Sequence, residues 1–95
     1  MSRPTLPQAH LDSWLSERPD WSVVEGKLHR AFTFEGFVAA FAWMGRVAEV
    51  AESMNHHPEW LNVYARVEVR LTTHDAGGLT SLDLELAESM ERSLP

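Results

Sequence analysis

The chain has 95 residues, a formal net charge of −6 at pH 7, 44% hydrophobic and 23% charged residues, and no cysteine. This length allows one domain with a modest core, and the composition argues against extended disorder. The negative charge disfavours direct binding to nucleic acid, and the cysteine count excludes disulfides and cysteine-bound metals. We therefore expect residues 1–95 to form a single globular domain.

No stretch of the sequence is typical of a membrane span. The longest apolar run, Phe37 to Met44, is much shorter than the roughly 20 residues that a membrane helix needs. The first ten residues lack the apolar segment of a secretory signal. We expect a cytoplasmic protein that does not bind membranes.

The first third of the chain predicts a helix and then a hairpin. Over residues 7–18, Leu11 and Trp14 lie at helical spacing. The following segments WSVVE and KLHRAFTF are separated by a glycine and are rich in β-branched and aromatic residues. This composition favours two antiparallel strands.

Residues 35–54 predict the longest helix. Apolar residues recur there three or four positions apart, and we expect this stripe to face the core. Trp43, Val38 and Val50 lie off the stripe, so the helix is apolar on more than one side. Such a helix is typically covered by a second layer or by another subunit. The predicted core stripe consists of Phe37, Phe41, Met44, Ala48 and Ala51.

The last third predicts a second hairpin and a third helix. Val67, Val69 and Leu71 alternate with polar residues, as in a strand with one face buried. Thr80 and Asp83 resemble a capping box at the start of a helix. The order helix, hairpin, helix, hairpin, helix predicts an α+β fold, in which helices pack on one face of a four-stranded antiparallel sheet.

Two adjacent histidines, His56 and His57, follow the predicted long helix. If the second hairpin turned at Ala65 and Arg66, His57 would lie opposite His74. Directly opposed residues have Cβ atoms about 5 Å apart. The sequence therefore predicts a site at which histidines from distant segments meet.

Glu52 lies four residues before His56, at the predicted C-terminal end of the long helix. Residues with this spacing can share one helix face. Both the carboxylate and the negative end of the helix dipole would favour the protonated imidazole. We expect His56 to be suited to donating a proton.

Three interpretations of these histidines remain open. Histidines at the ends of helices and strands often only bond to the backbone, and His10 and His29 are assigned to this class. A three-histidine metal site supported by Glu52 is the second, although the adjacent His56 and His57 would need an irregular backbone to reach one ion. Metal-free general acid–base catalysis is the third.

One long constellation of residue types spans the second half of the chain. It comprises an acidic residue, His-His-Pro, an aromatic residue, a histidine and an aspartate: Glu52, His56, His57, Pro58, Tyr64, His74 and Asp83. This spacing resembles the signature of the pterin-4a-carbinolamine dehydratase family. The stretches HHPEW, NVY, THDAGGLT and PDW also resemble that family, over nearly the whole chain. One departure is Ala65, where relatives often have Asn, a better turn former.

The resemblance implies the dehydration of 4a-hydroxytetrahydropterin to quinonoid dihydropterin and water, in support of tetrahydrobiopterin recycling. It implies no metal and no redox cofactor. By resemblance, His56 and His74 are the acid–base residues, and His57 mainly binds the pterin. Glu52 then binds the polar edge of the pterin or tunes His56, while Asp83 supports the site or only caps its helix.

The resemblance also carries expectations about the pocket walls and about partners. Trp60 and Tyr64 are candidate walls of the pterin pocket, with core packing as the alternative. A homodimer or homotetramer is expected. The alternative function is a non-catalytic, protein-binding role on the same fold, since animal relatives also serve as dimerisation cofactors of a homeodomain transcription factor.

Overall fold

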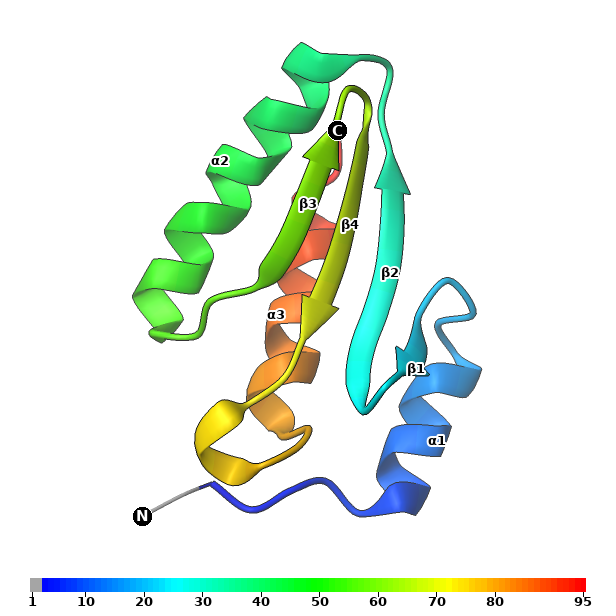
Figure 1. Cartoon of the computed structure of the whole chain (residues 1–95). Helices are drawn as coiled ribbons and strands as arrows, with labels where there is room; N and C mark the ends of the chain where they lie inside the picture. The colour runs from blue at the N-terminus through cyan, green and yellow to red at the C-terminus, as the bar shows by residue number, and fades with distance from the viewer. Residues whose placement is uncertain (1–2) are drawn as a thin grey trace.

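A computed structural model describes residues 3–95, which form three α-helices and one four-stranded antiparallel sheet (Figure 1). The predicted α+β class and the predicted order of elements are confirmed. A short 3₁₀ helix, His74–Ala76, precedes the last α-helix. The elements are α1 (Gln8–Ser16), β1 (Ser22–Val24), β2 (Lys27–Thr33), α2 (Phe37–Met54), β3 (Glu59–Val63), β4 (Arg66–Leu71) and α3 (Ser81–Arg92).

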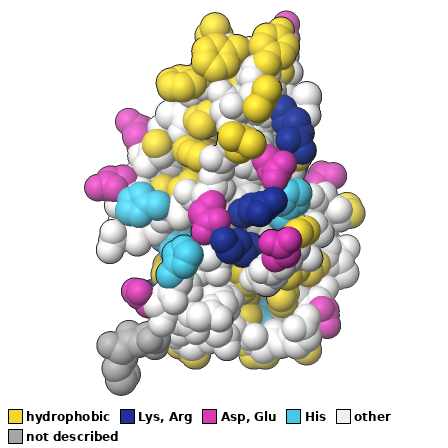
Figure 2. Space-filling view, in the orientation of Figure 1, with side chains coloured by type: hydrophobic (Ala, Val, Ile, Leu, Met, Phe, Trp, Pro, Cys, Tyr) yellow, Lys and Arg dark blue, Asp and Glu magenta, His cyan; other side chains and the backbone are white. Residues whose placement is uncertain are grey.

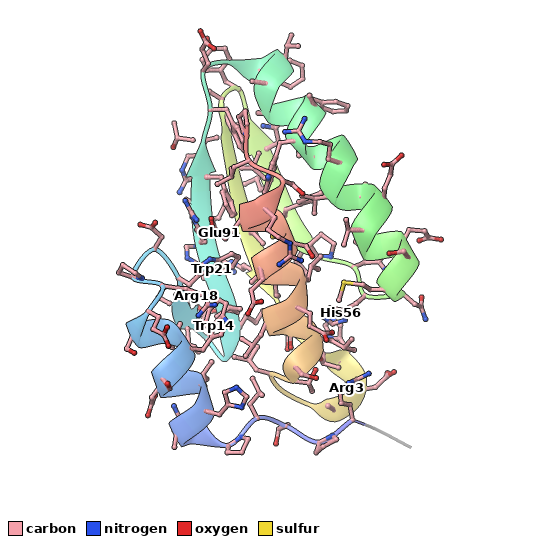
Figure 3. All side chains as sticks on the ribbon, turned by 180° about the vertical axis from the view of Figure 1, so that it is seen from behind. Arg3, Trp14, Arg18, Trp21, His56 and Glu91 are labelled. Atoms are coloured by element: carbon pink, nitrogen blue, oxygen red, sulfur yellow. The ribbon has the colours of Figure 1, made fainter. Side chains whose placement is uncertain are left out.

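The strands lie in the order β1-β2-β4-β3, so the two hairpins join through the β2–β4 pair. The β1–β2 turn places Glu25 and Gly26 at φ 53° and 78°, as a two-residue turn with two left-handed positions requires. The helices lie behind the sheet in Figure 1 and in front of it in the reversed view of Figure 3. Within residues 3–95, no helix covers the opposite face of the sheet.

The β3–β4 hairpin turns one residue earlier than the sequence predicted. Val63 pairs with Arg66, so the turn consists of Tyr64 and Ala65. Tyr64 adopts φ 51°, and the Asn62 side chain donates to the carbonyl oxygens of Tyr64 (3.1 Å) and Arg66 (3.0 Å). These two bonds close a turn that has no glycine, and residue preferences alone did not reveal them.

The core lies between the sheet and the helices. Val67, Val69 and Leu71 are fully buried on one face of β4, which confirms the predicted alternation. Phe32 from β2 packs against Trp43 from α2, with ring centroids 4.5 Å apart. This aromatic contact therefore joins α2 to the sheet.

The predicted core stripe of α2 was only partly correct: Ala51 is buried and Met44 packs against the core, but Phe37 and Phe41 are 48% and 59% exposed. The buried residues of α2 are Ala40, Trp43, Val47 and Ala51. Both stripes have helical spacing, so periodicity alone did not distinguish them. The face of α2 that carries Trp43 turns to the core. There the indole packs against the other aromatic side chains, and its Nε1 donates to the carbonyl oxygen of Met90 (3.0 Å). No helix within residues 3–95 is both long and apolar enough to cross a membrane.

Two tryptophans attach the N-terminal part of the chain to α3. Trp14 Nε1 donates to Glu88 Oε2, and Trp21 Nε1 donates to Glu91 Oε1, both at 2.9 Å. Arg18 stacks over the Trp14 ring. Figure 3 shows Trp14, Arg18 and Trp21 on one side of α3, with His56 on its other side. The two tryptophans are therefore part of the scaffold and lie apart from His56.

Candidate active site

Three histidines line one open pocket of about 250 Å³. The pocket lies where the end of α2, the loop after β4 and the start of α3 meet. Segments that are distant in sequence are thus brought together, as the sequence predicted. We call this site the histidine pocket; its lining residues are Asn55, His56, His57, Thr72, Thr73, His74, Asp75 and Leu82.

The end of α2 sets the direction of His56. Asn55 adopts the left-handed conformation (φ 50°, ψ 42°), and the N–H groups of His56 and Asn55 donate to the carbonyl oxygens of Ala51 (3.0 Å) and Glu52 (3.1 Å). This is the Schellman pattern of helix termination. The chain turns at Asn55, so His56 leaves the helix surface, and the predicted pairing of Glu52 with His56 was wrong.

His56 instead binds a buried carboxylate. Its Nε2 lies 2.7 Å from Asp83 Oδ1, and Asp83 is completely buried. The other carboxylate oxygen accepts from the Thr73 hydroxyl (2.8 Å) and from the Thr80 backbone N–H (2.9 Å). Asp83 therefore caps α3, as the capping box predicted, and orients the His56 ring at the same time.

His57 points to the exposed side of the pocket and pairs with Glu52. The distance from His57 Nε2 to Glu52 Oε1 is 2.8 Å, and both side chains are largely exposed. Salt bridges of this kind contribute little to stability in water. The Glu52–His57 contact can therefore reorganise around a ligand at little cost.

His74 lies on the compact loop between β4 and α3. Thr73 and Gly78 close this loop as a β-bridge, and Gly77 takes φ 72° within it. His74 Nε2 lies 3.3 Å from Glu59 Oε2. The other oxygen of Glu59 accepts from Lys27 Nζ at 2.7 Å, and this hydrogen bond is the main reason that the pKa of Glu59 is lowered.

The three pocket histidines share one arrangement. In each ring, Nε2 faces a carboxylate oxygen: Asp83 for His56, Glu52 for His57 and Glu59 for His74. A carboxylate at such a distance orients the imidazole ring, and Nδ1 is the ring nitrogen that this contact does not use. Such an arrangement can donate and accept protons at one small molecule.

The carboxylates do not form a metal-binding cluster with these histidines. Within residues 3–95, no group of three or more His, Asp or Glu side chains is arranged to hold a metal ion. Each ring faces a different carboxylate. The geometry therefore gives the three-histidine metal interpretation no support.

The two candidate aromatic residues lie elsewhere in this chain. Trp60 is half-buried and packs on the core, with its ring centroid 6.1 Å from that of Trp43. Tyr64 lies in the β3–β4 turn and lines a different pocket beside Phe37 and Val38. Neither residue lines the histidine pocket.

The sequence also missed several residues of the site. Leu82 supplies an apolar wall, and Thr72 and Thr73 line the strand end. Glu59 was overlooked although it lies within the HHPEW motif. Its position directly after His-His-Pro was the available signal, but its contact with His74 depends on tertiary structure.

Comparisons with known proteins agree with this description. The sequence model of the family described as "Pterin 4 alpha carbinolamine dehydratase" matches residues 4–93. A protein of Solibacter usitatus (strain Ellin6076), provisionally named a pterin-4-alpha-carbinolamine dehydratase, is 51% identical over 86 residues, which cover 90% of each chain. A protein of Chelativorans sp. (strain BNC1) with the same provisional name is 48% identical, covering 95% of this chain and 94% of its own.

A solved structure is similar over almost the full length. The crystal structure of a transcriptional coactivator/pterin dehydratase from Brucella melitensis superposes with a TM-score of 0.89 at 36% sequence identity. The match covers 96% of this chain and 99% of the other. The two chains therefore share this fold over almost their whole length.

Proposed function

Because the chain belongs to the pterin 4 alpha carbinolamine dehydratase family, we propose that it dehydrates a 4a-hydroxytetrahydropterin to quinonoid dihydropterin and water. It would then be a hydro-lyase that supports tetrahydrobiopterin recycling. The observation that carries this proposal is the histidine pocket, in which three imidazoles from two segments each face a carboxylate.

The reaction needs one proton donor and one proton acceptor. The 4a hydroxyl leaves as water when it takes a proton and the C4a–O bond breaks. The lone pair of the adjacent ring nitrogen forms the new C=N bond, and this nitrogen then loses its proton. Protons are balanced, so two imidazoles of opposite protonation state suffice.

We assign the acid–base roles to His56 and His74. His56 is held rigidly by the buried Asp83, which suits precise placement of its Nδ1. His74 lies at the pocket rim, where its exposed ring can exchange protons with water. His57 binds and orients the pterin, with Glu52 as its carboxylate partner. Asp83 acts in support, by orienting His56.

The two aromatic candidates for the pocket walls, Trp60 and Tyr64, are not included in this proposal. Tyr64 lies at the far end of the hairpin from His57, and the Trp60 ring faces the core, so neither is assigned to the pocket of the same chain. Thr72 and Leu82 replace them as candidate walls. A pterin has both polar edges and flat faces, and this mixed lining matches that character.

The experiment that tests the function is stopped-flow absorbance of freshly generated 4a-hydroxytetrahydropterin. Spontaneous dehydration gives the baseline, and catalytic amounts of chelator-treated protein should accelerate the reaction. A folded protein that gives no acceleration would remove the dehydratase assignment. Acceleration that disappears with chelator would instead indicate a metal-dependent reaction.

An exposed apolar surface favours self-association as well. Six large apolar side chains are between 48% and 81% exposed at the end of the molecule where α2 begins and β3 turns into β4. Figure 2 shows hydrophobic side chains gathered at this end. We call it the apolar end; its residues are Phe37, Val38, Phe41, Leu61, Val63 and Tyr64.

We propose that a second copy of the chain covers the apolar end. β3 is an edge strand of the sheet, and Leu61 and Val63 on it are 62% and 63% exposed. An edge strand presents unpaired backbone groups as well as side chains, which suits pairing with an identical strand. The alternative occupant is a different protein, since the Brucella melitensis relative is also titled a coactivator. Solution mass distinguishes the two.

A further inference from the structure

Glu59 does not line the histidine pocket, yet its carboxylate joins one pocket histidine to the sheet. Oε1 lies 2.7 Å from Lys27 Nζ, and Oε2 lies 3.3 Å from His74 Nε2. Because β4 separates β2 from β3, the bridge from Glu59 to Lys27 crosses β4. The carboxylate thereby connects two strands with the loop that carries His74.

His74 has few other restraints on its ring. Its side chain is 77% exposed, whereas that of His56 is 9% exposed and faces the buried Asp83. Within residues 3–95, Glu59 is the one carboxylate at ion-pair distance from His74. The orientation of the His74 ring therefore depends on Glu59 more than on any packing contact.

Other charged groups lie around this contact. Asp75 follows His74 in the chain, and His57 lines the same pocket from the α2 side. Arg70 is the cross-strand partner of Glu59, but its side chain contacts Glu68 at 3.3 Å. His56 is already paired with Asp83 on the side of α3. Lys27 thus remains the cation that holds Glu59 ionised and in place.

We propose that Glu59, anchored by Lys27, is a positioning residue that orients the His74 ring through Nε2 and leaves Nδ1 directed to the substrate. This inference rests on the proposed function, because it gives His74 a role in dehydration. Glu59 acts through His74 and does not itself touch the reacting atoms. Lys27 acts one step further away, through Glu59.

The test compares Glu59→Gln with a matched control on the same sheet. Glutamine keeps the shape of the side chain and removes its charge. The control is Glu68→Gln, since Glu68 also carries a lowered pKa, held first by Arg66, and lies 3.5 Å from His29. Proton NMR at one pH records the ring-proton chemical shifts of the histidines in the wild type and both variants.

The expected result is a crossed pattern. In Glu59→Gln, the ring-proton chemical shifts of His74 change, because the ring loses the carboxylate that its Nε2 faces, while those of His29 are unchanged. In Glu68→Gln, the ring-proton shifts of His29 change and those of His74 do not. Unchanged His74 ring-proton shifts in Glu59→Gln would overturn the proposal. So would an equal change for His74 in both variants, because it would reflect only overall charge.

The kinetic readout separates this inference from the proposed function. In a wild-type protein that accelerates dehydration, Glu59→Gln changes the pH–rate profile, whereas Glu68→Gln leaves it unchanged. An unchanged profile beside changed His74 resonances would overturn the role in positioning for catalysis. If the wild type gives no acceleration, the dehydratase assignment fails, while the ring-proton NMR spectra still show whether Glu59 orients His74.

Discussion

The two ends of the β3–β4 hairpin differ in whether their side chains have partners within the chain. At the strand-end side, each histidine of the histidine pocket faces a carboxylate of the same chain. At the turn side, the residues of the apolar end, including Phe37 and Val38, remain exposed. Polar side chains pair with one another at the first end, whereas large apolar side chains remain exposed at the second. The proposed chemistry and the proposed self-association therefore use opposite ends of one hairpin.

The largest expected effect concerns the histidine pocket. His74→Ala should reduce dehydration turnover by about 10² to 10⁴-fold, because it removes one of two proposed acid–base groups. The fold should be kept, since the His74 side chain is 77% exposed. Stopped-flow turnover and circular dichroism measure the two quantities. His10→Ala, on the exposed surface of α1, is the control. Unchanged turnover in folded His74→Ala would remove His74 from the mechanism.

The second-largest expected effect concerns the stability of the fold around the buried Asp83. Asp83→Ala should lower the free energy of unfolding by about 3 kcal/mol, since it leaves His56 and the Thr73 hydroxyl without their buried partner and removes a cap of α3. Urea denaturation measures this change. Asp75→Ala, at an exposed loop position, should change it by less than about 0.5 kcal/mol. Equal effects in the two variants would show that the Asp83 network is not structurally important.

A charge at the apolar end tests whether that surface is an interface. Val38→Glu should weaken self-association by about tenfold or more, because it places an unpaired charge against a second copy. Its effect on the fold should be small, since Val38 is 81% exposed. Sedimentation velocity over a concentration series measures the mass. Val24→Glu, an exposed valine on β1, should leave association unchanged. A wild type that is monomeric at every concentration would contradict the self-association proposal.

The smallest effect concerns the pH response around Glu59. Lys27→Met should raise the pKa of Glu59 toward its ordinary value, because the Lys27 hydrogen bond is the largest cause of the lowering. At pH values above the unfolded-state pKa of Glu59, the Lys27–Glu59 pair stabilises the fold. This stabilisation is lost as the pH falls through the lower pKa that Glu59 has in the folded state. The stability difference between wild type and Lys27→Met should therefore shrink on acidification. Carboxyl ¹³C NMR follows Glu59, with Glu68 as an internal reference.

Much of the fold was predictable from local pattern. The alternation of Val67, Val69 and Leu71 defined the buried face of β4, and Thr80 with Asp83 defined the start of α3. These features depend on interactions between residues close in sequence, such as strand pleating and helix capping. Local signals failed where two arrangements had equal periodicity, as in α2, where Trp43 rather than Phe41 faces the core.

The sequence by itself determined the class of the protein, its α+β order and the set of histidines, because spacing and residue type are properties of the chain. Only the tertiary structure decided which carboxylate faces which histidine. The left-handed turn at Asn55 directs His56 to Asp83 and leaves Glu52 to His57, and packing of β3 beside β4 brings Glu59 to His74. These contacts join segments distant in the chain, so their geometry depends on the packing of helices and sheet.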